Sequence, residues 1–245
     1  MQPPRTCERT QVPLAHTRQT RAPALQVTSH SNGSTDVPAC PGWSCLDVLE
    51  HTAKGAGVWA AFLEADDSQD AIEALITEVG NAQTWGAELG DLVPAARIRL
   101  DGFLNTARSV DPNKPALFWN GPAAAEVMLC HSATESWIPV ADVAAALGTD
   151  APLLEDEAAD LLAWSVMFRT LAAAWRGDDH PATITIEATD TQQTFVLGDE
   201  RPAATVVGTA RELSLSLWGR THVSPAGDYE KLTAWADLAM ISPLG

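Results

Sequence analysis

Between residues 44 and 175, hydrophobic side chains recur at the period of amphipathic helices, in segments separated by turn residues. Ser44 and Asp47 have the spacing of a capping box, which marks the start of the first segment. Gly148 follows the last apolar residues of the fourth segment and marks its end. The pattern predicts helices over residues 44–65, 68–79, 93–108, 123–148 and 158–175.

Pro139 interrupts the fourth of these helices. A proline has no backbone N–H to donate to the carbonyl group of Glu135, so we expect the helix to kink or restart there. A restart is plausible because proline is favoured in the first turn of a helix, and the segment VADVAAALG follows.

The period changes from helical to strand-like near residue 182. Three short segments rich in β-branched residues, ATITIEAT, TFVLGD and ATVVGT, are bounded by turn residues and predict strands. Thr209 and Glu212 then form a second capping-box pattern before a helix that ends at Gly219. A short strand over residues 221–224 and a helix over residues 228–239 complete the prediction.

This change of period predicts an α+β protein of two units, a helical bundle followed by a smaller α+β domain. Residues 1–36 mix Pro, Thr, Gln, Arg and Ser without a regular period. They lack the apolar face that would offset the entropy of ordering them, so we expect a disordered leader. The expected units are therefore 1–36, 37–150 and 151–245, the last including the connecting helix.

Composition excludes several classes of function. The formal net charge of −17 repels phosphate backbones, which disfavours nucleic-acid binding. No apolar run reaches the ~20 residues needed to cross a bilayer, and no convincing secretory signal begins the chain. The four cysteines show no C-x-x-C pair, which fits a reducing compartment. We therefore expect a cytoplasmic protein without a membrane partner, either a monomer or a homodimer.

The stretch CHSATESWIPVAD contains the most suggestive chemistry. His131 and Glu135 lie four residues apart, and a histidine and a carboxylate one helical turn apart can share a metal ion. The alternative is a histidine and a carboxylate that simply lie on a helix surface. The pair is therefore either half of a metal site or the remnant of one.

Several motifs together resemble the mycothiol-dependent maleylpyruvate isomerase family of actinobacteria. They are VPACPGW, DVLEH, AALG and TARELSLSLWGR, in this order between Val37 and the C-terminus. The resemblance implies a DinB-like N-terminal four-helix bundle and a C-terminal α+β domain similar to sterol-carrier folds. It also implies mycothiol as the thiol cofactor and a divalent metal ion, usually zinc.

The resemblance carries over two of three metal ligands. His51 matches the histidine that follows the PGW turn, and Glu135 matches the glutamate of an E-x-x-x-H pair, but the histidine of that pair falls on Pro139. Either His131 supplies the missing nitrogen from a shifted position, or the site has been lost. Asp142 matches a position from which a carboxylate orients a metal-bound histidine.

Two further residues are candidates for ligand binding. Arg220 has the planar fork that binds a carboxylate, which suits an acidic substrate or the thiol cofactor, although it could also balance a helix dipole. Trp43 could form a wall of a ligand cleft or simply pack in the core.

The expected function is a metal- and mycothiol-dependent thiol-transfer or isomerase-type enzyme acting on a small organic acid, with an intact or a degenerate metal site. The alternatives are a non-catalytic protein that binds a small ligand, and an interaction protein with an acidic surface.

Overall fold

The computed structural model describes residues 33–65, 89–118, 121–151, 153–177, 181–198, 200–220 and 223–238. The helix predicted over residues 68–79 and most of the predicted leader lie outside the described residues. Within the described part of the chain, no helix combines the length and the hydropathy that crossing a membrane requires.

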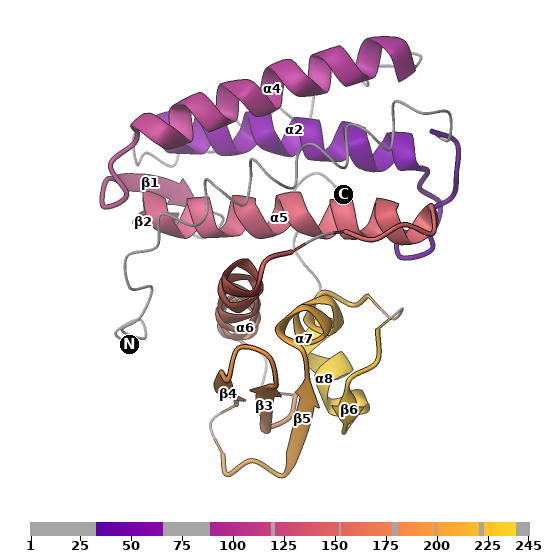
Figure 1. The fold of residues 1–245 in the computed structure, drawn as a ribbon. Helices are drawn as coiled ribbons and strands as arrows, with labels where there is room; N and C mark the ends of the chain where they lie inside the picture. Colours follow the sequence, from indigo (N-terminus) through magenta and orange to yellow (C-terminus); the bar gives the residue numbers. More distant parts are fainter. Residues whose placement is uncertain are drawn as a thin grey trace.

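Three long helices form the upper layer of the molecule, namely α2 (Cys45–Glu64), α4 (Leu89–Ser109) and α5 (Ala125–Ala146). They lie alongside one another, with α2 between the other two (Figure 1). A small antiparallel hairpin, β1 (Pro115–Phe118) and β2 (Gly121–Ala124), joins α4 to α5 and was not predicted. The helix predicted from residue 93 begins four residues earlier, and α4 accommodates Pro94 in its interior.

The start of α2 is built as the sequence predicts. The backbone N–H of Asp47 donates to Ser44 Oγ over 3.3 Å, and the backbone N–H of Ser44 donates to Asp47 Oδ2 over 2.7 Å. Four residues of the predicted leader, 33–36, are described, and they pair with this helix start. The carbonyl of Gly33 accepts from Leu46, and the carbonyl of Thr35 accepts from Cys45.

Helix α5 continues past Pro139 without a break, so the predicted restart is wrong. The proline removes one backbone hydrogen bond, worth about 1 kcal/mol net. Its neighbours Ile138 and Val140 are 2% and 5% exposed. Burying two such side chains contributes about 1.5–3 kcal/mol each, which outweighs the lost bond and keeps the helix in place. As predicted, the helix closes at Gly148, whose φ is +65°.

The lower part of the molecule contains α6 (Glu155–Arg176), α7 (Ala210–Leu217), α8 (Tyr229–Ala236) and a four-stranded sheet. Helix α6 is seen end-on where α5 is seen lengthwise, so the two helices cross (Figure 1). The second capping box is confirmed at the start of α7, where Glu212 N–H donates to Thr209 Oγ1 over 3.2 Å.

The sheet has the order β4-β3-β5-β6, with β3 parallel to β5 and the other pairs antiparallel. Its strands are β3 (Ile184–Ala188), β4 (Thr194–Leu197), β5 (Ala204–Gly208) and β6 (Ala226–Gly227). The first three confirm the predicted strands. The prediction of a strand over residues 221–224 is wrong for its two described residues, because β5 pairs instead with β6, two residues further on.

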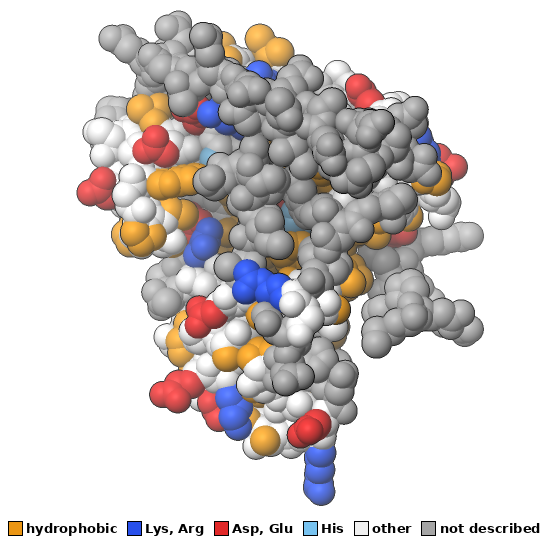
Figure 2. Space-filling view, turned by 180° about the vertical axis from the view of Figure 1, so that it is seen from behind, with side chains coloured by type: hydrophobic (Ala, Val, Ile, Leu, Met, Phe, Trp, Pro, Cys, Tyr) orange, Lys and Arg blue, Asp and Glu red, His pale blue; other side chains and the backbone are white. Residues whose placement is uncertain are grey.

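One hydrophobic core runs through both layers. It includes Trp137 on α5, Leu162 on α6, Ile184 on β3 and Trp235 on α8, each with no exposed surface. The mixed fold of a helical part followed by a part that contains the sheet is therefore confirmed, while the division into separate domains at residue 150 stays a prediction. On the face seen in Figure 2, Asp and Glu side chains are dispersed, with Lys and Arg side chains between them.

Candidate functional site

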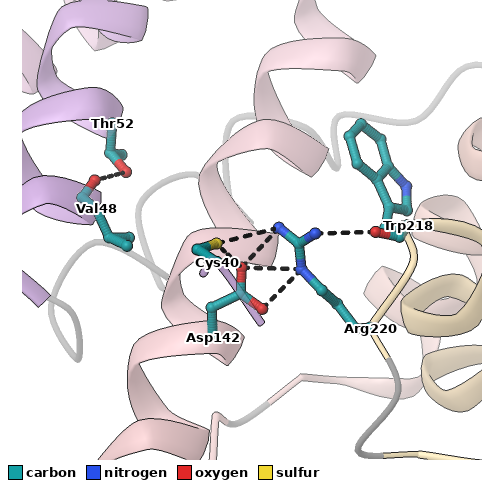
Figure 3. A network of polar contacts seen from close by, with 6 residues as sticks. All are labelled: Cys40, Val48, Thr52, Asp142, Trp218 and Arg220. Carbon is teal, nitrogen blue, oxygen red and sulfur yellow. Dashed lines mark hydrogen bonds and ion pairs between the residues drawn. The ribbon is translucent and has the colours of Figure 1, made fainter. Parts of the chain in front are cut away.

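Asp142, Arg220 and Cys40 meet between the two layers, from three separate parts of the chain (Figure 3). Arg220 Nε donates to Asp142 Oδ1 over 2.8 Å and to Oδ2 over 3.0 Å, and Nη2 donates to Oδ2 over 2.7 Å. Asp142 is 1% exposed, whereas Arg220 is 21% exposed. A charged, two-pronged pair with one buried partner is held in a single geometry and joins α5 to the end of α7.

Local sequence explains how Arg220 reaches Asp142. Helix α7 ends at Trp218, and Gly219 adopts a φ of +72°, a conformation that glycine tolerates best. This turn lets the N–H of Arg220 donate to the carbonyl of Leu215 over 2.8 Å. The guanidinium group is fixed from its other side as well, since Nη1 donates to the carbonyl of Trp218 over 3.0 Å. The LWGR motif therefore holds the Arg220 side chain in one position.

The surroundings keep Arg220 charged. Burial alone would lower the pKa of Arg220, but the Asp142 carboxylate outweighs burial and raises that pKa above its ordinary value. Asp142 was expected to orient a metal-bound histidine, and in the structure it binds this guanidinium instead.

Cys40 lies in the turn before α2 and completes the group. Its thiol donates to Asp142 Oδ2 over 3.7 Å, and Arg220 Nη2 lies 3.9 Å from its sulfur. Burial, and then the Asp142 charge, raise the pKa of the Cys40 thiol, although Arg220 opposes them. The sequence shows no C-x-x-C pair among the cysteines, and no partner was predicted for Cys40. The signal that it had a partner was only its place in the CPGW motif.

His51 lies on α2 and packs against Trp43. The two ring centroids are 5.1 Å apart, with the planes at 62°. Burial lowers the pKa of His51, and the charges of Lys54 and Arg220 act in the same direction. His51 is therefore neutral near pH 7, and it lies within the electrostatic reach of the predicted substrate-binding arginine.

His131 lies in the core and not on the surface of α5, since only 2% of the residue is exposed. Four aromatic rings surround it, with centroids between 4.9 and 6.5 Å from its own: Phe118, Trp164, Phe168 and Trp218. Burial, and then the charge of Arg169, lower the pKa of His131 to about 3. The expectation of a histidine on the helix surface is wrong.

Glu135 lies one turn further along α5. Its Oε1 is 3.9 Å from His131 Nε2, so the structure brings these two predicted ligands together. The side chain of Glu135 is 13% exposed. Burial raises the pKa of Glu135 to about 7, although the nearby charges of Arg220 and Arg169 oppose the rise. A carboxyl group of this kind is partly protonated at neutral pH.

Arg169 is a charged residue near the site that sequence reasoning missed. It lies on α6, is 2% exposed, and its Nη1 donates to the carbonyl of Leu238 over 2.8 Å. The guanidinium carbon is 5.0 Å from the ring centroid of Trp218 and 5.9 Å from that of Phe168. Burial lowers its pKa to about 10, so the group stays charged at neutral pH. A single charge within the apolar stretch WSVMFRTLAAAW was the available signal.

The predicted metal ligands do not form a three-ligand site. Among the residues that the structure describes, no group of three or more His, Cys, Asp or Glu side chains is arranged to hold a metal ion. A zinc site needs at least three protein ligands even when it leaves a position open for catalysis. His131 and Glu135 approach each other to 3.9 Å. The assignment of His51, His131 and Glu135 as metal ligands stays a prediction.

Comparisons with known proteins agree with the fold. Residues 14–144 match the family model described as the mycothiol maleylpyruvate isomerase N-terminal domain, and the match begins within the predicted leader. No curated protein matches the sequence closely enough to count as a relative.

Two solved structures are similar to this chain. One is the mycothiol-dependent maleylpyruvate isomerase, with 13% identity, and the other is a histidine-to-alanine variant of that isomerase, with 12% identity. For both, the TM-score is 0.63, and the match covers 88% of this chain and 91% of the other. At this level of identity the similarity establishes the shared fold.

Proposed function

Because the chain belongs to the mycothiol maleylpyruvate isomerase family, we propose that it is a mycothiol-dependent thiol-transfer or isomerase-type enzyme for a small organic acid. The observation that carries the proposal is the position of Arg220. Asp142 holds its charged guanidinium group at the junction of the two layers, and 21% of the side chain stays exposed.

Arg220 has the donors to bind an anion. A guanidinium group carries five N–H donors. Asp142 and the carbonyl of Trp218 occupy only part of this set, and Nη1 has a second hydrogen for which the described residues supply no acceptor. Arg220 is therefore the residue we assign to a substrate carboxylate. Arg220 Nη2 also lies 3.9 Å from the Cys40 sulfur, so the guanidinium group can be approached by a sulfur atom.

When bound, mycothiol would supply a nucleophilic sulfur that adds to, and later leaves, a double bond of the substrate. The chain would contribute a proton acceptor and a wall of the site. His51 is held neutral, so a ring nitrogen is able to take the proton of a thiol, and the charge of Arg220 favours the resulting anion. Trp43, packed edge-on against His51, would exclude water from one side.

A turnover assay tests this proposal. Maleylpyruvate is mixed with mycothiol and the purified full chain, and its conversion is followed by absorbance. Arg220→Gln should lower kcat/KM by about tenfold or more, as expected for the loss of a charged hydrogen bond to substrate. Arg211→Gln is the matched control, because Arg211 binds the exposed Asp150 and should not affect turnover. Equal activity of wild type and Arg220→Gln would disprove the assignment.

A second candidate is a non-catalytic protein that binds the same ligands. The absence of a three-ligand metal group among the described residues favours it, because the resemblance implies such a group in the enzymes. Mycothiol that raises the melting temperature without any turnover of several cis-unsaturated acids would support this candidate over the enzyme.

A further inference from the structure

We infer that the guanidinium groups of Arg220 and Arg169 supply the positive charge of this site, which therefore binds an anionic ligand directly and holds no resident metal ion. The inference relies on the proposed function only for the place of the site. It rests on three observations: the donor set, the positions of the two arginines, and the continuity of α5.

The predicted metal ligands are unsuited to zinc because aromatic side chains surround His131. His131 is 2% exposed and enclosed by four aromatic rings, which occupy the space that further ligands or water would need. A catalytic zinc ion takes three protein ligands and keeps a position for water or substrate. The surroundings of His131 are those of a core residue that packs against Phe168, at a ring distance of 4.9 Å.

The continuity of α5 also excludes a three-ligand metal site completed by a side chain that follows Pro139. A restart at Pro139 would have let the following turn rotate and present another side chain to Glu135. Instead the helix is continuous from Ala125 to Ala146, so Pro139 keeps the place of the histidine that the resemblance implies. The proline ring has no atom that can bind a metal ion.

The two arginines meet at Trp218. The guanidinium carbon of Arg169 is 5.0 Å from the centroid of the Trp218 ring, and Arg220 Nη1 donates to the Trp218 carbonyl over 3.0 Å. His131 packs against the same tryptophan, with the ring centroids 6.5 Å apart. A divalent cation brought to this part of the protein would therefore be repelled by two guanidinium groups.

The two arginines have different roles. Arg220 is 21% exposed and can touch a ligand. Arg169 is 2% exposed and contacts the carbonyl of Leu238 and the ring of Trp218. It therefore does not touch a ligand, and it acts on the site through its positive charge and through the position of Trp218. Arg169 is thus a positioning residue behind Arg220. The ligand class is a small carboxylate or thiolate, and a metal-dependent ligand is excluded by the proposal.

The test uses the full chain and the maleate dianion as a probe. Zinc content is measured by mass spectrometry after incubation with one equivalent of zinc and desalting, and maleate binding is measured by calorimetry with and without EDTA. We expect less than about 0.1 zinc per chain and the same maleate affinity in both conditions, because the described ligand set falls short of a structural or catalytic zinc site. Arg220→Gln should weaken maleate binding by about tenfold or more, while Arg211→Gln should leave it unchanged.

Arg169 is tested with a pair of variants, because removing a buried charge can disturb folding. Arg169→Gln should weaken maleate binding, and Arg169→Lys, which keeps the charge, should restore most of it in protein whose near-UV circular dichroism matches wild type. Loss of binding in folded Arg169→Lys would contradict the role of charge.

The inference is overturned if the chain retains about one zinc ion and EDTA abolishes maleate binding, as expected for a three-ligand site. It is equally overturned if wild type does not bind maleate, or if Arg220→Gln binds it normally. Failure of the proposed function looks different: maleate binds as described, without metal, but the chain converts no substrate in the presence of mycothiol.

Discussion

Replacing Asp142 with asparagine should destabilise the protein far more than the same change in a surface ion pair. Asp142 is 1% exposed and accepts hydrogen bonds of 2.7, 2.8 and 3.0 Å from Arg220. Two unit charges about 4 Å apart attract by about 4 kcal/mol at the effective dielectric constant of such sites. Asparagine keeps one acceptor, and the partly exposed Arg220 can turn toward water, so we expect a loss of about 3 kcal/mol.

The matched control is Asp150→Asn. Asp150, in the connection between α5 and α6, also accepts from an arginine, Arg211 Nη1 on α7 over 2.9 Å, but it is 79% exposed. Exposed pairs of this kind contribute about 0–1 kcal/mol, so the control should be nearly neutral.

Urea denaturation followed by circular dichroism gives both values for the free energy of unfolding. A loss of 3 kcal/mol would lower the melting temperature by about 6–12 °C in a chain of this size. A cost below about 1 kcal/mol for Asp142→Asn, or equal costs for both variants, would refute the view that this buried pair fastens the layers together.

Two further variants test α5. The folded pKa of Glu135 is raised to about 7, above its unfolded value of 4.5, so the stability it contributes is present below pH 4.5 and is lost as pH rises through 7. The unfolding free energy of wild type minus that of Glu135→Gln should therefore fall by about 3 kcal/mol between pH 4.5 and pH 8, and a flat difference would contradict the pKa. Pro139→Ala should raise the unfolding free energy by about 1 kcal/mol, because alanine restores an N–H to the helix and loses little packing. A destabilised Pro139→Ala in urea denaturation would show instead that the proline ring contributes more than the missing bond.

The sequence by itself determined the features that depend on neighbours in the chain. Two helix starts were specified locally, by Ser44 with Asp47 and by Thr209 with Glu212. In each capping box the hydrogen bonds join residues only three positions apart in the chain. The three β-branched segments formed strands, since alternation and turn residues are also local signals. The family was also identified from the sequence, because its motifs occur there in the same order.

Tertiary structure decided the features that depend on contacts between distant segments. The rule that proline breaks a helix is local, and it failed at Pro139 because the flanking apolar residues are buried against other parts of the protein. The pairing of Asp142 with Arg220 joins residues 78 positions apart, and nothing in either segment alone identifies the partner.

The fate of His131 shows the same limit. Its spacing from Glu135 was visible in the sequence, but whether it lay on a surface, bound a metal or packed in the core depended on the rings that surround it. Those rings come from β1, α6 and the end of α7. Burial, which sets the charge state of both His131 and Glu135, is a property of all the packed segments together, so only the folded chain could assign their chemistry.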